Sequence, residues 1–286
     1  MKKENISWCR KTSIMIRAFL ICTAAVMMMS FSSVKVHAQE ISEVEPNDTS
    51  DQAQLIFANS ETAAGCVNGS YTGQRVINGT ISSSDTDWYR VSLSAGTNYV
   101  TSNGASYYFD IYLESDLANP VASGLYTNVG LGITAYEFTL SSSGTYYVKL
   151  VGVSSSAAAY KFLIGSPTYS VADYTYSFGS ISMNGSNVTR TFNLTYDASI
   201  PADAIVYSLS ISNLSSSYNN GVTVQNLSSG TSYALSSTNL TTNISVYSNV
   251  PLKASWKYTF KYKKTGTISP RTTFYYVYPV TSNLVD

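Results

Sequence analysis

An acidic segment at positions 43–48, with the sequence EVEPND, carries the side chains best suited to chemistry. In an extended chain, residues two apart point the same way. Glu43, Glu45 and Asn47 would therefore present three oxygen-bearing side chains on one side. Pro46 favours the extended form and restricts the residue before it to that form as well.

Asp48 follows the first acidic cluster, at a turn. A second acidic pair, Asp85 and Asp87, lies just before a clear strand pattern. Crowded carboxylates repel one another unless a cation neutralises them. Ca²⁺ is a hard ion that takes 6–8 oxygen ligands. Two such clusters, brought together by the fold, would supply a calcium site. A solvated acidic edge fits the spacing equally well.

Histidine chemistry is excluded from the exported part of the chain. The only His in the sequence is His37, which lies in the leader predicted below. Ser-His-Asp and Cys-His catalysis need an imidazole base, and the zinc-protease pattern needs two histidines. Zinc and copper sites also rely on His and Cys ligands, so we expect neither metal.

Glycoside hydrolysis is the enzyme class that the composition leaves open. It needs two carboxylates about 5–9.5 Å apart, and Glu43 with Asp85, or Asp110 with Glu114, are carboxylate pairs that the sequence does not exclude. Nothing in the sequence separates such a pair from a calcium site or from a solvated strand face. We therefore expect a protein without catalytic activity.

Residues 1–38 have the features of a signal peptide. A basic start with five Lys or Arg residues is followed by an apolar run at 18–31. A membrane span takes about 20 residues, so this run is short for one. The sequence VHA at 36–38 then has the small-residue pattern of a cleavage site. We predict a secreted chain that starts at about Gln39, without membrane insertion after cleavage; a single membrane anchor is the alternative.

The composition favours a folded protein that does not bind nucleic acid. Charged residues make up 12% of the chain and aromatic residues 13%, whereas globular proteins carry about 25% charged residues and disordered chains have few aromatics. The net charge is zero, so no global basic charge supports nucleic-acid binding. After the leader is removed, Cys66 stands alone, which rules out an intramolecular disulfide. We expect it to be a small buried residue; an intermolecular or reactive role is the alternative.

Short runs with apolar residues at alternate positions recur throughout the mature chain, and Gly, Ser and Asn bound them. This pattern indicates half-buried strands. The clearest runs are 89–93, 109–113, 146–150, 160–164, 192–196 and 205–211. Many short strands with turn signals between them predict an all-β protein built from sandwiches or jelly rolls.

A change of charge near position 166 suggests two domains, at 39–166 and 167–286. The first range carries 12 acidic and 4 basic residues, a net charge of −8, and the second carries 4 acidic and 7 basic residues, a net charge of +3. Each range has a common domain length.

Five pieces of sequence along residues 41–165 carry a family resemblance. They are EVEPNDT at 43–49, GTI at 79–81 followed by DTDWY at 85–89, LSAG at 93–96, DIYL at 110–113 and GTYYV at 144–148. In this order they resemble the bacterial pre-peptidase C-terminal domain. That group includes the collagen-binding domains of clostridial collagenases.

The resemblance implies a β-sandwich of jelly-roll type with a structural calcium site. In calcium-binding members, the acidic N-terminal motif and the later Asp-rich loop form the site. The matching positions in this sequence are Glu43, Glu45, Asn47, Asp48, Asp85 and Asp87. Ser84 or a nearby backbone carbonyl would add to them, while Asp110 matches a structural position. Such domains usually follow a secreted peptidase. In this sequence the predicted leader is followed directly by the domain itself. This indicates a free-standing module or the binding part of a split system.

The second range, whose family we do not recognise, is expected to form an immunoglobulin-like or related sandwich. Its clearest strand, at 256–264, alternates aromatic residues with residues that are mostly lysines. We expect the aromatic face in the core and the lysine face in water; a basic strip for acidic polymers is the alternative. The run at 274–278 has aromatic residues on both faces, so some must lie at the surface. Exposed Tyr suits sugar or protein recognition.

Together these patterns predict a secreted, calcium-stabilised binding module that attaches to an extracellular polymer. The polymer would be a matrix protein such as collagen or a cell-wall polysaccharide. One alternative is an accessory or scaffold partner of a secreted peptidase or surface protein. The other is a carboxylate-dependent glycan hydrolase.

Overall fold

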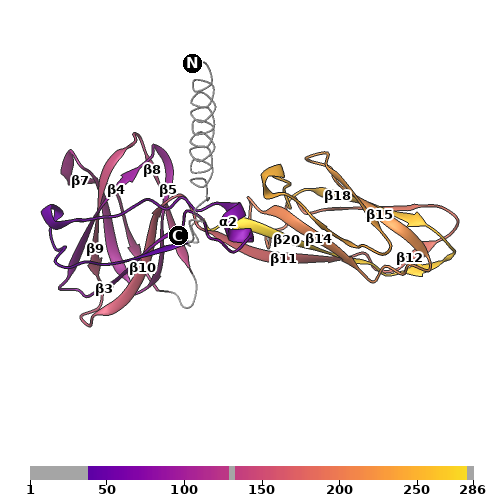
Figure 1. Ribbon diagram of the computed structural model, residues 1–286, viewed down its shortest axis with the longest axis horizontal. Helices are drawn as coiled ribbons and strands as arrows, with labels where there is room; N and C mark the ends of the chain where they lie inside the picture. Colours follow the sequence, from indigo (N-terminus) through magenta and orange to yellow (C-terminus); the bar gives the residue numbers. More distant parts are fainter. Residues whose placement is uncertain (1–37, 129–132, 282–286) are drawn as a thin grey trace, which may run out of the picture. The chain divides into compact units, whose positions relative to one another are not determined.

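Strands form nearly all the regular structure of the described residues (Figure 1). The computed structural model describes residues 38–128 and 133–281, so the predicted signal peptide lies outside the described residues except for Ala38. The prediction of an all-β protein with sandwich-like domains is confirmed. None of the helices in the described ranges is long and apolar enough to cross a membrane.

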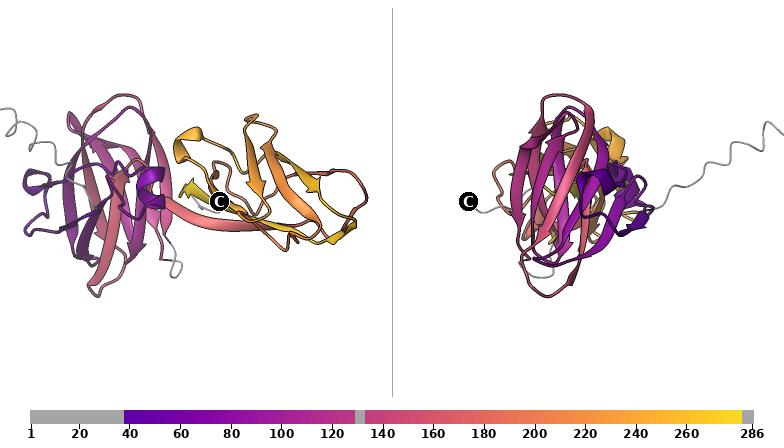
Figure 2. Two further views of the ribbon diagram at one scale, coloured as in Figure 1. Left: turned by 45° about the vertical axis from the view of Figure 1, so that its right-hand side comes forward. Right: turned by 90° about the vertical axis from the view of Figure 1, so that its left-hand side faces the viewer.

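The first sandwich consists of two five-stranded sheets that share one core (Figure 2). We name each sheet after its central strand. The β10 sheet contains, in order, β1 (Gln39–Ser42), β3 (Arg75–Ile81), β10 (Ala158–Gly165), β5 (Gly96–Gly104) and β8 (Thr134–Leu140). The β9 sheet contains β2 (Gln54–Leu55), β4 (Thr86–Leu93), β9 (Gly144–Gly152), β6 (Tyr107–Leu113) and β7 (Asp116–Tyr126). Two short helices, η2 (Ser50–Gln52) and α2 (Ala63–Val67), lie outside the sheets.

Period-two alternation builds the first core, as the sequence predicts. In β4, Tyr89 and Val91 are fully buried, and in β9 their cross-strand partners Val148 and Tyr146 are buried as well. The residues between them face outward and are more exposed. Cys66 in α2 is also buried, as expected, and burial raises the pKa of its thiol to about 11.

The second sandwich consists of two four-stranded sheets and a strand pair around another core. The β20 sheet contains, in order, β11 (Tyr169–Ser177), β20 (Arg271–Pro279), β14 (Ile205–Ser212) and β17 (Thr241–Asn243). The β18 sheet contains β13 (Val188–Asn193), β18 (Ser255–Tyr262), β15 (Asn219–Asn226) and β16 (Ser232–Ser236). The strand pair is β12 (Ile181–Met183) with β19 (Gly266–Ile268), and η3 (Val246–Ser248) is a short helix.

The aromatic face of β18 forms the centre of the second core. Trp256, Tyr258 and Phe260 are fully buried, whereas Lys257 and Lys261, which point to the other side of the strand, are exposed. The Trp256 indole donates a hydrogen bond of 3.0 Å to the Leu252 carbonyl. The expected aromatic core face and exposed lysine face are therefore both present, and this exposure fits a solvated face and a basic strip for acidic polymers alike.

Two details of the strand prediction are wrong. The run at 192–196 does not stay a strand, because β13 ends at Asn193 and the chain turns, leaving Tyr196 89% exposed. In the run at 205–211, a register shift after Val206 changes which residues face inward. Val206 is consequently fully buried in place of Tyr207, which the simple alternation would bury.

The two cores draw their buried side chains from separate stretches of the chain. The first uses residues between Ile56 and Ile164, and the second uses residues between Ile181 and Tyr276. The domain boundary at 166 and 167 stays a prediction.

Candidate metal centre and binding face

The acidic segment 43–48 is fixed by backbone contacts to β3 and β4. Strand β1, which leads into it, pairs in parallel with β3. The amide of Glu43 then donates to the Asn78 carbonyl at 2.8 Å, and the amide of Trp88 donates to the Asn47 carbonyl at 2.9 Å. The segment therefore reaches β4 close to Asp87, the inward-facing residue next to Trp88.

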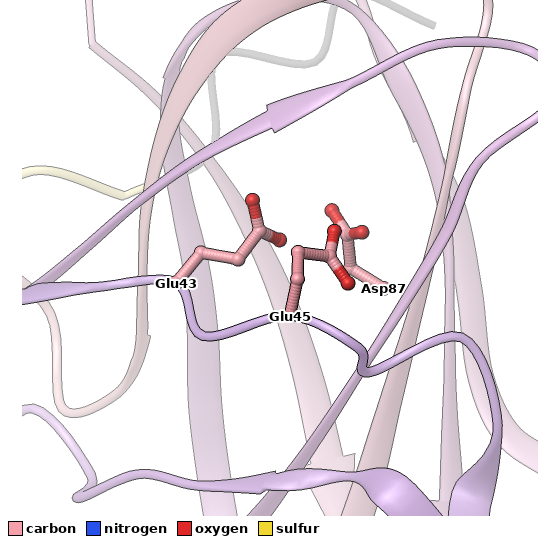
Figure 3. A group of neighbouring side chains, drawn as sticks. All are labelled: Glu43, Glu45 and Asp87. Atoms are coloured by element: carbon pink, nitrogen blue, oxygen red, sulfur yellow. The ribbon is translucent and has the colours of Figure 1, made fainter.

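Three carboxylates meet at this point. Glu43, Glu45 and Asp87 each offer one oxygen, and these oxygens lie within 4.8 Å of one another. Figure 3 shows the Glu43 and Glu45 side chains rising from one segment with their carboxylates directed toward Asp87. Asp87 is fully buried, Glu43 is half-buried and Glu45 is exposed. The cluster thus lies at the surface with one member in the interior.

Two buried tyrosine hydroxyls hold the carboxylates from the core side. Tyr89 donates to Glu43 at 3.0 Å, and Tyr160 lies 3.1 Å from the same oxygen and 2.7 Å from Asp87. The two hydroxyls are 2.5 Å apart. Burial raises the pKa of Tyr89 and of Tyr160, so both hydroxyls stay protonated and serve as donors.

Gly79 in β3 leaves the space that the Tyr160 ring needs. A Cβ atom at position 79 would lie 2.5 Å from both Cζ and the hydroxyl oxygen of Tyr160. Position 79 is the Gly of the GTI piece. A glycine therefore lets Tyr160 reach the carboxylates from across the sheet.

Negative charge accumulates at the cluster without a cationic side chain. The two ion pairs of the described residues, Arg90–Glu114 and Lys161–Glu40, involve none of the cluster carboxylates. Burial raises the pKa of Asp87 well above its usual range, and the nearby Glu43 carboxylate raises it further. A buried, unpaired carboxylate is costly unless a cation or a proton neutralises it.

Two oxygens in the centre are buried and have no partner. They are Oδ1 of Asn47 and Oδ1 of Asp87, and both residues are fully buried. Buried polar atoms in folded proteins nearly always have a partner. Carboxylate and amide oxygens with unused lone pairs are the ligands that Ca²⁺ prefers. The donor set therefore fits a hard divalent cation.

The structure brings some of the predicted ligands together and leaves others at the periphery. Asn47 joins the three-carboxylate cluster, because its backbone amide donates to Glu45 at 2.9 Å and its side-chain amide lies 3.4 Å from Glu43. Asp48 and Asp85 lie outside the cluster. Burial raises the pKa of Asp85, and the charges of Glu43 and Asp48 raise it further, so these two are electrostatic neighbours.

Two further positions named from the sequence have local roles. Ser84 lies 3.1 Å from the hydroxyl of Ser82. Asp110 accepts hydrogen bonds from Ser123 at 2.6 Å and from Tyr112 at 3.2 Å on the β9 sheet, as a structural position would. Tyr89 and Tyr160 are site residues that the sequence reasoning missed. A Tyr at an inward strand position is the available signal, because a buried hydroxyl needs a partner.

The outer face of the β9 sheet is rich in apolar side chains. Tyr108 in β6 is paired with Val151 in β9 and with Leu125 in β7, which makes a row across three strands. Tyr108 is 53% exposed and Leu125 is 43% exposed. Val121 in β7 and Val153 after β9 are exposed as well.

Aromatic rings continue this surface toward β4. Trp88 stacks on Tyr112 with 5.6 Å between ring centroids, and its centroid lies 6.4 Å from that of Tyr147. We call seven residues the apolar face: Trp88, Tyr108, Val121, Leu125, Tyr147, Val151 and Val153. Tyr112, which is only 8% exposed, supports Trp88 from below this surface. By contrast, no strand residue of the β10 sheet is among the exposed large hydrophobic residues of the described chain.

Comparison with known proteins identifies a shared fold. No protein-family model matches the chain, and no curated protein matches it in sequence. A crystal structure of a protein from Eubacterium rectale, assigned as secreted, matches 87% of this chain and 89% of its own, with 12% identity and a TM-score of 0.52. That likeness shows the fold. The pre-peptidase C-terminal domain of a collagenase from Bacillus anthracis is similar over 43% of this chain and 99% of its own, with 20% identity and a TM-score of 0.29.

Proposed function

We propose that this chain is a secreted, non-catalytic binding module, stabilised by Ca²⁺, that attaches to an extracellular polymer. The polymer is a matrix protein such as collagen or a cell-wall polysaccharide. The observation that carries the proposal is the apolar face of the β9 sheet. Exposed apolar side chains that gather on one face mark interaction sites, and Tyr and Trp contribute strongly to binding energy at such sites. On this face the charged residues Asp110 and Lys149 lie between the two apolar rows.

Calcium has a structural role in this proposal. Bound by Glu43, Glu45, Asn47 and Asp87, it would neutralise the clustered charge and supply partners for the two unpaired oxygens. It would also tie the segment before Asp48 to β4. A ligand that binds only the folded state, at a hundredfold excess over its Kd, stabilises that state by about 2.7 kcal/mol.

The positions of the remaining carboxylates support a role without catalysis. Glu114 is paired with Arg90 at 2.6 Å, and Asp110 accepts hydrogen bonds from two hydroxyls. These two groups are therefore engaged in the sheet surface. Glu43 belongs to the three-carboxylate cluster, and the mature chain has no His to serve as a base.

Cosedimentation of residues 39–286 with collagen fibrils, chitin, cellulose and peptidoglycan tests the binding function. We expect retention on at least one polymer. A Tyr108→Ser/Leu125→Ser variant should bind about tenfold more weakly, which corresponds to about 1.4 kcal/mol. The matched control is Tyr196→Ser/Tyr247→Ser, which removes two tyrosines that are 89% and 83% exposed but lie in the second sandwich.

Retention of wild type and control with loss in the Tyr108/Leu125 variant would support the proposal. Retention of that variant equal to that of wild type would show that the apolar face does not bind the polymer. Failure to bind any of the four polymers, with capture of a secreted peptidase from the same cells, would favour the accessory role instead.

A further inference from the structure

The outer face of the β18 sheet is basic and has no carboxylates. Lys257 and Lys261 stand on this face and are exposed, while the residues on the other side of β18 are buried. The acidic residues in the described part of the second sandwich lie outside this sheet. Asp173 is in β11, and Asp197 and Asp203 lie between β13 and β14.

Short polar side chains surround the lysines. In one row, Thr189, Thr259 and Thr223 follow one another across β13, β18 and β15, and the Thr189 and Thr259 hydroxyls are 3.2 Å apart. The next row contains Thr191, Lys257, Gln225 and Ser232. We call these seven residues and Lys261 the lysine–threonine face. None of the seven side chains in these two rows is aromatic or acidic.

The two lysines have no internal partner. Neither Lys257 nor Lys261 forms an ion pair or a hydrogen bond within the described residues, whose two ion pairs both lie in the first sandwich. On the outer face of the β9 sheet, by contrast, Arg90 is paired with Glu114. The positive charge of the lysine–threonine face is therefore available to an external anion, in a range (167–286) that carries a net charge of +3.

From these contacts we infer that the lysine–threonine face binds a linear acidic polysaccharide whose charges are carboxylates. Ammonium groups make strong charge-assisted hydrogen bonds to carboxylates, and the Thr, Ser and Gln side chains can exchange hydrogen bonds with sugar hydroxyls. The inference rests on the proposed function only in assuming that the protein is secreted and encounters extracellular polymers. It concerns the lysine–threonine face and not the apolar face.

The spacing of the charges decides the class of polymer. Lys257 and Lys261 are four residues apart on one strand, which corresponds to about 13 Å. Uncharged polar side chains outnumber them on the face. A polymer rich in hydroxyls with widely spaced charges matches this arrangement. A phosphodiester chain, with its dense charge, would leave most of its charges without a partner there.

Calorimetric titration of residues 39–286 with hyaluronan tests the inference, with carboxyl-methylated hyaluronan and polyphosphate as comparison polymers. We expect hyaluronan to bind, the methylated form to bind at least about tenfold more weakly, and the affinity to fall as salt screens the charges. A Lys257→Glu/Lys261→Glu variant should lose at least about tenfold in affinity, because two charge-assisted hydrogen bonds are lost. The matched control is Lys264→Glu/Arg271→Glu, which makes the same change in net charge outside the face.

Three results would overturn the inference: unchanged hyaluronan binding by the Lys257/Lys261 variant, equal loss in the control, or tighter binding of polyphosphate than of hyaluronan. If the Lys257→Glu/Lys261→Glu variant has a lower melting temperature than wild type, the Lys257→Gln/Lys261→Gln variant should be used for the same test. The Tyr108→Ser/Leu125→Ser variant separates this inference from the proposed function. It should keep hyaluronan binding whether or not it loses the other polymers, and loss of hyaluronan binding would assign that ligand to the apolar face.

Discussion

The two charged regions of the molecule are built in opposite ways. At the candidate metal centre, Glu43 and Asp87 are held by buried hydroxyls, and two buried oxygens have no partner. On the lysine–threonine face, Lys257 and Lys261 are exposed and surrounded by short polar side chains. Burial makes the first region dependent on neutralisation for the stability of the fold. Water already solvates the second, so its charges affect recognition and hardly affect stability.

The largest effect should come from the core under the lysine–threonine face. Trp256→Ala removes a fully buried indole and its hydrogen bond to Leu252, and such truncations cost about 3–5 kcal/mol. Chemical unfolding should show this loss for the second sandwich both in Ca²⁺ and in EDTA. Lys257→Ala, one residue away and exposed, should change the unfolding free energy by less than about 0.5 kcal/mol. A loss of unfolding free energy in Trp256→Ala that appears only in Ca²⁺ would show that the stability of the second sandwich depends on the candidate metal centre, against the proposal.

A smaller effect should follow from filling the space behind the metal centre. In Gly79→Ala the new methyl group would meet the Tyr160 ring at 2.5 Å, and overpacking of this kind costs about 1–3 kcal/mol. Because Tyr160 holds Asp87, the variant should also have a weaker response to Ca²⁺ in thermal melts. Gly144→Ala is the control, since its nearest neighbour would be Leu113 at 3.7 Å. An unchanged calcium response in Gly79→Ala would show that the position of Tyr160 does not affect calcium binding.

Glu61 offers a test of buried charge away from the metal centre. It is 3% exposed, its Oε2 accepts hydrogen bonds from Thr168 and Gln74, and its Oε1 has no partner. Burial raises its pKa above the ordinary value, so the folded state binds a proton more tightly than the unfolded state does. The unfolding free energy should therefore fall as pH rises from the ordinary pKa to the raised one.

Glu61→Gln removes this titration. The melting temperature of the variant relative to wild type should accordingly be higher at pH 8 than at pH 4, by an amount that corresponds to about 1.4 kcal/mol per unit of pKa shift. Melting curves across that pH range measure the difference. A difference that is the same at both ends would mean that Glu61 titrates normally.

The smallest effect should come from the ion pair on the outer face of the β9 sheet. Arg90 and Glu114 are 2.6 Å apart, but their side chains are 43% and 46% exposed. Exposed ion pairs contribute about 0–1 kcal/mol. Glu114→Gln should therefore change the unfolding free energy by less than about 0.5 kcal/mol, and added salt should reduce that difference further. A larger loss in urea unfolding would show that surface charge matters to stability here as well.

Period-two patterns predicted much of the structure, because strand alternation depends only on local sequence. Glu43 and Glu45 do meet at the cluster, but the segment bends at Glu45 and is not a strand, so the predicted alternation is not the reason. Their meeting with Asp87 was implied by the family resemblance. The hydroxyls of Tyr89 and Tyr160 were not predicted, since an inward Tyr has the same pattern whether its hydroxyl holds a carboxylate or a backbone group. The register shift after Val206 was also missed, because a bulge adds a residue without changing the composition of the run.

The central claim is that the acidic cluster is a calcium site that stabilises the first sandwich. Its most direct test is the thermal unfolding of residues 39–286 in excess Ca²⁺ and in EDTA, beside a Glu45→Ala/Asp87→Ala variant. The account predicts that Ca²⁺ raises the melting temperature of wild type by several degrees, as a stabilisation of about 2.7 kcal/mol would, and that the variant does not respond. Identical melting of wild type in Ca²⁺ and EDTA would contradict it, as would an unchanged calcium response in the variant.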